Sequence, residues 1–269
     1  MTLFNHKRVI YKKNPLVRVV CQLRFPRILV INDKEPVNFQ EKIRETFPNY
    51  QRIVEEQHLI KLNYVPNDSL STLSNAQSQL INNYHFSSLD GNWHINLTSS
   101  FLALSTSSYK RWEDFITKII EPLEALKEIY KPAIFERVGL RYIDAFKKSF
   151  LDSIDTDWSN LIEPFALGFM SAPAFKNEVS TLQTLVDLNI DDKTKAKIRL
   201  GKGFYNDIND WPPLSELNES YIVDSDIYAV QKQLHEINNC FYYLHDYTTK
   251  ILRSVISDKL HNAMEPQEI

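Results

Sequence analysis

Period-two alternation of side-chain types over Val17–Phe25 is the feature that most limits how this chain can fold. The odd-numbered residues of this segment are all apolar, whereas the even-numbered ones include Arg18, Gln22 and Arg24. Successive side chains of a β-strand point to opposite faces, so the pattern predicts a strand with one buried and one polar face. Prolines bracket the segment, which suits the two ends of a strand.

A second stretch, residues 135–144 (FERVGLRYID), repeats the pattern. Its even-numbered residues from 138 to 142 are apolar, and its other face carries Arg137, Gly139 and Arg141. This stretch therefore predicts another strand with a basic face.

The dipeptide Asp90-Gly91 separates two further alternating segments. Because Gly accepts the positive φ that a type I′ turn requires, the dipeptide predicts a two-residue hairpin turn. That turn sets Phe86 opposite Ile95 and Tyr84 opposite Leu97, and both pairs are apolar. The other face of the hairpin then carries His85, Ser87, His94 and Asn96.

Two segments have the three- and four-residue apolar spacing of amphipathic helices. The first runs from Tyr109 to Pro132, where Pro122 is expected to bend or split it. The second runs from Gln231 to Ala263 and would be about 45–50 Å long at ~1.5 Å per residue. A shorter helix is expected at 36–47, followed by a strand at 57–65.

The order of these elements predicts an α+β fold. We expect two mainly antiparallel β-sheet halves, each packed against one long helix and tightly associated. Residues 1–148 are expected to form the first half, in the order β-α-β, a hairpin-rich sheet, then α-β. Residues 149–269 are expected to form a β-meander with the C-terminal helix, and the boundary is placed near Ser149 to Pro164. The length also suits one structural unit.

The composition excludes several classes of site. Only five glycines occur in 269 residues, and the chain has no Walker loop, Rossmann fingerprint or Gly-x-Ser-x-Gly elbow. A net charge of −3 gives no general attraction to nucleic acid, and no apolar run reaches the ~18 residues of a membrane helix. Two distant cysteines, Cys21 and Cys240, and an N-terminus without an apolar signal region predict a cytoplasmic protein with reduced thiols.

Three stretches carry a family resemblance, namely NPLVRVVCQLRFP at 14–26, FERVGLRYID at 135–144 and the pair Leu234-His235. Together they resemble a sporadically distributed family of uncharacterised bacterial and archaeal proteins. The similarity covers nearly the whole chain, and RVGLRY is its most specific part, although Arg18 stands where an acid is expected. The resemblance implies no catalytic residue, and the patchy distribution of the family suggests cargo of mobile or defence loci.

The face that carries Arg137 and Arg141 is the first candidate site. If this strand neighbours the first one, Arg18 and Arg24 would line the same surface, with Gly139 leaving room for a ligand at the backbone. Forked guanidiniums bind phosphate and carboxylate groups. The structural alternative is that acids from a helix or from the second half pair with these arginines.

A second candidate is the basic strand KTKAKIRLGKG at 193–203. Lys195, Lys197 and Arg199 share one face, and such a row of cations suits a phosphate backbone. In the alternative reading the preceding strand neutralises them, and alignment of the apolar faces sets Asp187 opposite Arg199. The same register sets Asn189 opposite Lys197, Leu188 opposite Ile198, and Ile190 opposite Ala196.

Metal and nucleophilic sites have little support in the sequence. His85 and His94 share a hairpin face, but zinc takes three or four ligands and no third lies nearby in sequence. Asp187, Asp224 and Asp226 suit a two-metal hydrolase only if they converge, and otherwise serve as partners for the basic faces. We therefore assign no catalytic residue, no metal ligand and no cofactor.

The sequence predicts a non-enzymatic intracellular binding or adaptor protein, accessory to a bacterial defence or toxin locus. The expected partner is a protein, either a second copy held through the C-terminal helix or a product of the same locus, and no membrane is expected. The first alternative is a nucleic-acid or nucleotide-binding protein that uses the arginine and lysine strand faces. The least favoured alternative is a metal-dependent hydrolase that uses the aspartates.

Overall fold

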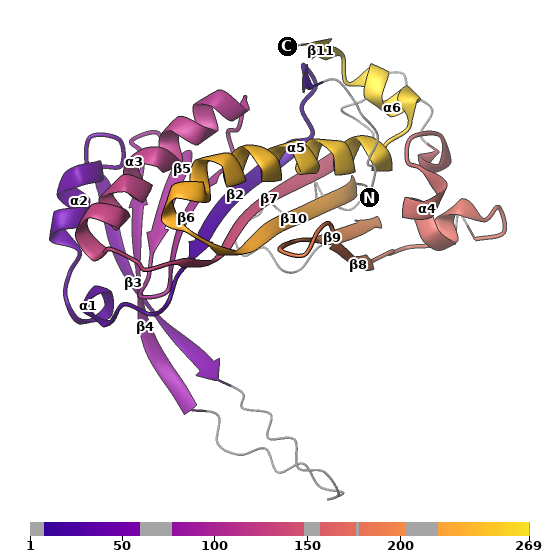
Figure 1. The fold of residues 1–269 in the computed structure, drawn as a ribbon. Coiled ribbons are helices and arrows are strands. Elements are labelled where there is room, and N and C mark those ends of the chain that lie inside the picture. The colour runs from indigo at the N-terminus through magenta and orange to yellow at the C-terminus, as the bar shows by residue number, and fades with distance from the viewer. Residues whose placement is uncertain (1–7, 60–76, 148–156, 176–177, 203–219, 269) are drawn as a thin grey trace, which may run out of the picture.

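The computed structural model describes residues 8–59, 77–147, 157–175, 178–202 and 220–268 (Figure 1). Nine antiparallel strands form one sheet in the order β3-β4-β5-β6-β2-β7-β10-β9-β8. They are β2 (Leu16–Arg24), β3 (Asn49–Leu59), β4 (Gln77–Ser87), β5 (Trp93–Leu97), β6 (Phe101–Thr106), β7 (Phe135–Lys147), β8 (Thr184–Asn189), β9 (Thr194–Lys202) and β10 (Ser220–Lys232). A second, two-stranded sheet pairs β1 (Val9–Tyr11) with β11 (Pro266–Glu268).

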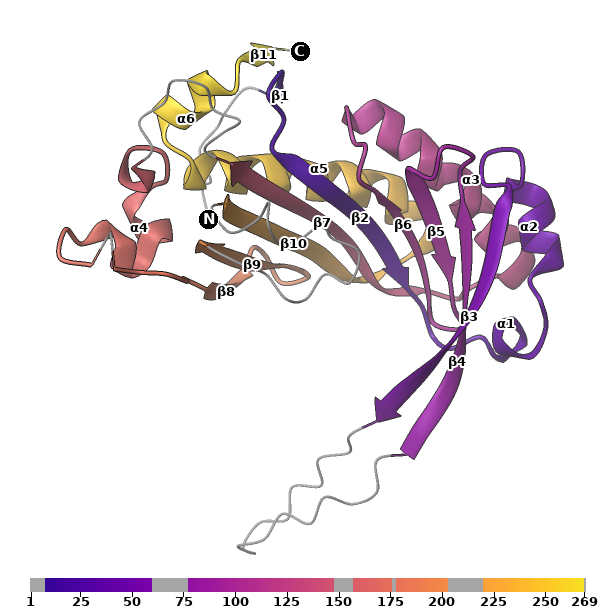
Figure 2. The same ribbon diagram turned by 180° about the vertical axis from the view of Figure 1, so that it is seen from behind.

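Helices lie along one face of the nine-stranded sheet (Figures 1 and 2). The two long helices are α3 (Trp112–Tyr130) and α5 (Ile237–Val255), and the shorter ones are α1 (Leu29–Asp33), α2 (Val37–Ile43), α4 (Pro164–Leu167) and α6 (Asp258–Ala263). Short 3-10 turns are η2 (Trp158–Asn160), η3 (Gly168–Ser171) and η5 (Leu234–Glu236). The opposite face of the sheet, which is turned to the viewer in Figure 2, is called the open face below.

The core lies between the sheet and its helices, at the positions that the alternation predicts. The apolar side of β2 is buried from Val19 to Phe25, and α3 packs its own stripe against the sheet. The buried residues of that stripe include Phe115, Ile119, Leu123 and Leu126. Each fully buried side chain of this size stabilises the fold by about 1.5–3 kcal/mol. The apolar stripe of α5 packs on β7 and β10 of the same chain, so its buried residues are not free to hold a second copy.

The predicted α+β class is confirmed. The two expected halves meet edge to edge, because β7 of the first half pairs along its length with β10 of the second. A single sheet therefore runs through both halves. On the same face of this sheet, α3 covers the strands of the first half and α5 covers β7 and β10. The proposed boundary near Ser149 to Pro164 lies partly outside the described residues, and the division into two domains stays a prediction.

The hairpin register is confirmed, but the predicted two-residue turn is wrong. Tyr84 faces Leu97 and Phe86 faces Ile95, as expected. The loop has four residues, closed by a hydrogen bond from Ser88 N to Trp93 O of 3.0 Å. Gly91 has a φ of +69°, whereas Asp90 is not in the left-handed region that a type I′ turn requires. Instead, the Asp90 carboxylate accepts hydrogen bonds from Ser88 and Asn92 and so fixes a wider turn.

The C-terminal helix is shorter than the apolar spacing predicts. β10 continues to Lys232, so α5 starts only at Ile237, and the helix ends at Val255. Ile256 then forms a bridge with Ile162, and the Ser257 hydroxyl caps α6 by accepting from Leu260 N at 3.2 Å. The apolar spacing continues past Val255, but the bridge to Ile162 and the N-cap at Ser257 end the helix there.

The first long helix is a single helix despite Pro122. Pro122 is buried inside α3, which runs without a break from Trp112 to Tyr130. Lys131 ends it in the left-handed conformation, with φ of 47°. Within the described ranges, no helix is both long and apolar enough to cross a membrane.

Candidate functional site

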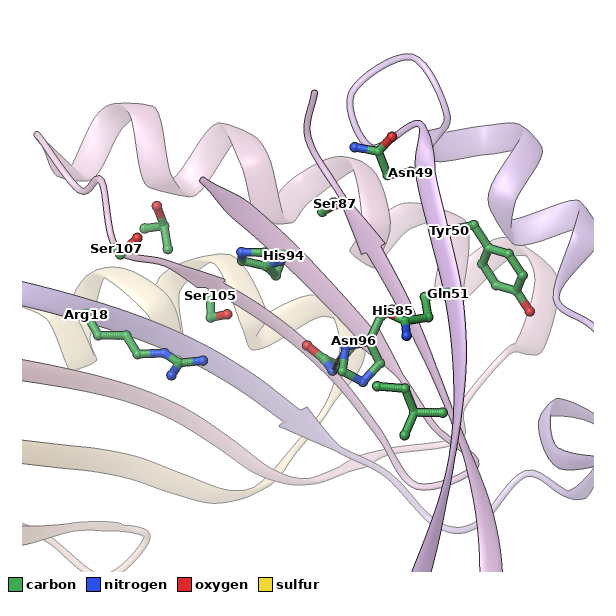
Figure 3. Close-up of a pocket in the computed structure, with 12 residues that line it drawn as sticks. Arg18, Asn49, Tyr50, Gln51, His85, Ser87, His94, Asn96, Ser105 and Ser107 are labelled. Carbon is green, nitrogen blue, oxygen red and sulfur yellow. Dashed lines mark hydrogen bonds between the residues drawn. The ribbon is translucent and has the colours of Figure 1, made fainter. Parts of the chain in front are cut away.

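The open face is hollowed by a groove of about 690 Å³ across β2 to β6 (Figure 3). Its lining residues are Arg18, Asn49, Tyr50, Gln51, Ile53, His85, Ser87, His94, Asn96, Ser105, Thr106 and Ser107. A volume of this size suits a drug-sized or nucleotide-sized molecule.

Strand alternation explains why polar side chains collect in this groove. The residues of β4 and β5 that pair in register alternate between the core and the open face. Phe86 and Ile95 pack into the core, so their neighbours His85, Ser87, His94 and Asn96 point to the open face. These four positions are the polar hairpin face that the sequence predicts, and the structure places all four in the groove.

Hydrogen bonds hold part of the lining in place. Asn96 Nδ2 lies 3.0 Å from His85 Nε2 and 3.2 Å from Asn83 Oδ1, so the amide bridges β5 and β4. Asn49 Nδ2 donates to Ser88 O at 3.1 Å. Figure 3 shows Arg18 reaching from β2 toward these strands.

The electrostatic character of the groove follows from its side chains. Among the described residues that line it there is an arginine, Arg18, and two histidines, His85 and His94, but no aspartate or glutamate. The remaining polar groups are amides and hydroxyls, which donate and accept. Such a lining is suited to a ligand that carries a phosphate or carboxylate group.

Arg137 and Arg141 also lie on the open face, where acids of the second half meet them. Arg137 Nη2 donates to both carboxylate oxygens of Asp226, at 2.6 and 2.8 Å. Arg141 donates from Nε and Nη2 to Asp224, at 2.7 and 2.6 Å. Asp224 is fully buried and accepts a further bond of 3.1 Å from Arg199 Nη1. Both arginines are thus paired with acids of the second half, as the structural alternative predicts, and these acids come from β10.

Gly139 leaves room for the side chain of Arg137. A Cβ atom on Gly139 would lie 2.3 Å from Nη1 of Arg137 and 2.8 Å from its Cζ. The Arg137 side chain therefore runs flat over Gly139 to reach Asp226, and its Cζ lies 4.4 Å from the ring centroid of Tyr228. The space above this glycine, where a ligand was expected to approach, holds a guanidinium.

The other two predicted arginines lie apart from this network. Arg18 is in the groove, at one end of β2. Arg24 is at the other end of the strand, exposed, in a separate hollow of about 300 Å³ that it shares with Gln22 and Glu55. The four arginines thus share one sheet face but do not converge on one ligand-sized site.

The basic strand pairs as predicted with β8, but the predicted register is wrong by two residues. Asp187 lies opposite Lys197, and Asn189 opposite Lys195. The Asp191 carboxylate accepts from the backbone N of Lys193 and Thr194, both at 2.8 Å, and tightens the turn that sets this register. Lys197 Nζ lies 3.6 Å from Asp187 Oδ1, whereas Arg199 turns to Asp224. Lys195 remains exposed.

The sequence interpretation missed the groove residues of β3 and β6. The strand expected at 57–65 starts earlier, because β3 covers Asn49–Leu59, and 60–65 lie outside the described residues. Asn49 and Gln51 therefore reach the groove from a segment that was not recognised as a strand. The segment NYQRIV, which starts at Asn49, does not alternate strictly between polar and apolar residues, so the pattern gave no clear signal for this strand start.

Metal ligands do not cluster in the described part of the chain. No group of three or more His, Cys, Asp or Glu residues there is arranged to hold a metal ion. Asp224 and Asp226 instead accept hydrogen bonds from arginines.

No protein-family model matches the chain, and no curated protein is significantly similar to it. The resemblance noted in the sequence therefore stays a prediction.

Proposed function

We propose that this is a binding protein that holds an anionic ligand in the open-face groove. The observation that supports this proposal most strongly is the lining: Arg18, two histidines, amides and hydroxyls converge on one hollow, and no carboxylate lines it among the described residues. A ligand with a phosphate or carboxylate group would find donors on several strands at once. We place this activity in the cytoplasm, where the buried free thiols of Cys21 and Cys240 would stay reduced.

The role proposed is that of a non-enzymatic adaptor, accessory to a defence or toxin locus. Ligand binding would change how this adaptor binds a protein partner. The buried side of α5 is already packed on the sheet, so a partner would have to use another surface. The exposed aromatic residues Phe165, Phe169 and Phe175 around α4 supply one.

A nucleic-acid ligand is the second candidate. Arg18 and the basic side of β9 lie on the same sheet face, because in-register neighbours across β2, β7, β10 and β9 share a face. A strand that starts in the groove and continues past Lys195 and Lys197 would meet cations along its backbone. Single-stranded nucleic acid fits such a track better than a duplex.

One binding experiment separates these candidates. Titration calorimetry with inorganic phosphate, a nucleoside triphosphate and a single-stranded oligonucleotide is run on the wild type, Arg18→Gln and the double variant Lys195→Gln/Lys197→Gln. The small-ligand proposal expects binding of a small anion that Arg18→Gln weakens about tenfold and the lysine variant leaves unchanged. Oligonucleotide binding that both variants weaken would favour the second candidate. Absence of binding to all three probes would refute both.

A further inference from the structure

A second cavity lies on the helix side of the sheet, beneath α5. Its volume is about 80 Å³, and it is separate from the open-face groove. The side chains that matter most in it are those of Tyr11, Tyr109, Trp112, Tyr142, Asp144 and His245. Because a water occupies about 30 Å³ in the liquid, the cavity has room for about two or three waters or a ligand of similar size.

His245 brings an unsatisfied nitrogen to this cavity. Its ring stacks on Trp112 with centroids 4.4 Å apart and planes 5° apart, and its Nδ1 lies 2.9 Å from the Tyr142 hydroxyl. The Tyr142 hydroxyl donates to Tyr109 at 3.1 Å, so it accepts from Nδ1–H and leaves Nε2 as an acceptor. His245 is only 7% exposed, and Nε2 has no hydrogen-bond partner. Burial lowers the pKa of His245 to about 4, which keeps the ring neutral.

Asp144 brings a buried carboxyl to the same cavity. The residue is 3% exposed, and no hydrogen bond joins its carboxyl to another residue of the described ranges. Burial, together with the nearby Asp224 carboxylate on the other side of the sheet, raises the pKa of Asp144 to about 8. A positively charged donor next to this carboxyl would favour its ionised form and lower its pKa again.

We propose that this cavity binds the ammonium group of a small amine. The ammonium donates to Asp144 and to Nε2 of His245, and the rings of Tyr11, Tyr109 and Tyr142 flank it, as aromatic residues do in other sites for organic cations. Both acceptors are buried and lack partners among the described residues, so a ligand with several N–H donors satisfies them together. The site is independent of the groove proposed above, because it lies on the opposite face of the sheet.

Three cationic side chains, Arg8, Lys110 and Arg111, also line the cavity, and all three are exposed. Apart from Asp144 and His245, the titratable or charged groups that line it or lie behind it include Arg8, Tyr11, Tyr109, Lys110, Arg111, Tyr142 and Asp224, and the charges of Glu113, Asp246 and Arg253 also act on His245 or Tyr11. Arg8 and Arg111 are exposed, and both bond to Glu113, at 2.8 and 3.0 Å. Burial raises the pKa of Tyr11 and of Tyr109 to about 12, so neither hydroxyl ionises near neutral pH. Among these charges, that of Asp224 is the one that raises the pKa of Asp144.

Amine binding is tested by calorimetry on the full chain with methylammonium as the probe. We expect saturable binding at pH 8.5 that becomes about tenfold weaker per pH unit below pH 8, since the ligand must displace the proton of Asp144. Asp144→Asn removes the charge without changing the shape and should weaken binding at least tenfold. His245→Phe keeps a ring against Trp112 and should weaken binding several-fold. The groove variant Arg18→Gln serves as the control and should bind methylammonium as the wild type does.

Three outcomes would overturn the proposal. The first is no heat of binding at any pH, which would mean that the cavity holds only water. The second is an equal response to K⁺, which has no N–H to donate to Nε2, so the cavity would not be selecting a hydrogen-bond donor. The third is an Asp144→Asn variant that binds methylammonium as tightly as the wild type, which would mean that the amine does not bind at this carboxyl. If Asp144→Asn fails to fold, the His245→Phe result and the pH profile decide the question.

Discussion

Arg141 and Asp224 are joined by two hydrogen bonds, 2.7 Å from Nε and 2.6 Å from Nη2, across the pair of β7 and β10. Asp224 also accepts from Arg199 of β9, so one buried carboxylate links three neighbouring strands. The residue directly opposite Arg141 is Asp226, and Arg141 reaches past it to the diagonal position. Asp226 is thereby left to Arg137, which reaches it across Gly139.

Loss of the Asp224 charge should destabilise the sheet strongly. Asp224→Asn leaves the guanidiniums of Arg141 and Arg199 without their shared carboxylate, and removal of one partner from a buried pair costs about 3 kcal/mol. Urea unfolding measures the loss. The matched control is Asp187→Asn, whose side chain is 69% exposed beside Lys197 and should cost less than about 1 kcal/mol. Equal losses in the two variants would contradict the central role of Asp224.

Gly139 should be required only because Arg137 lies over it. Gly139→Ala pushes the guanidinium off Asp226 and Tyr228 and should cost about 1–2 kcal/mol of unfolding free energy. In an Arg137→Ala background the same change should be neutral or slightly stabilising, since alanine suits a strand better than glycine. A double-mutant cycle measures the difference. A cost that does not depend on residue 137 would mean that the backbone itself needs glycine.

Alternation predicts which face of a strand is buried, but not what the other face contacts. The buried side of β2 and the hairpin register follow directly from the sequence, because period-two patterning fixes both. The predicted β8–β9 register is wrong by two residues, because a two-residue shift leaves every side chain on the same face of the sheet. The turn that Asp191 stabilises decides between the two registers.

The candidate sites were predictable to different extents. The four polar hairpin residues of the groove follow from the register, whereas Asn49 and Gln51 depend on a strand start that local patterning did not mark. The pairing of Arg137 with Asp226 joins residues 89 apart in sequence, so no local pattern identifies it. The cavity of Asp144 and His245 likewise needs the packing of α5 on β7, which the sequence predicts only in outline.

Both cysteine thiols should be inert in the folded protein. Cys21 and Cys240 are buried, and burial raises the pKa of both thiols, that of Cys240 to about 11. A thiol-reactive disulfide reagent at pH 8 should therefore modify neither residue in native protein but two thiols per chain in guanidinium chloride. The variant Cys21→Ala should lower the second value to one. Fast modification without denaturant would show that one of these thiols is accessible.

Stability in the absence of ligand should fall between pH 6.5 and pH 8. The pKa of Asp144 rises from its unfolded value of ~3.9 to about 8 on folding, so between these values the folded chain binds the extra proton and stability falls as pH rises. The pKa of His245 falls from about 6.5 to about 4, so its contribution rises with pH over that lower range and opposes that of Asp144. Above pH 6.5 only the Asp144 contribution remains, and it amounts to at most ~2 kcal/mol over 1.5 pH units.

Urea unfolding at several pH values separates the two groups. Asp144→Asn cannot titrate, so its stability should lose the decline between pH 6.5 and pH 8. His245→Phe should keep that decline and add a steeper fall between pH 4.5 and pH 6.5, where the opposing contribution of the imidazole is gone. A wild-type profile that is flat above pH 6.5, and unchanged by Asp144→Asn, would mean that folding does not raise the pKa of Asp144 into this range.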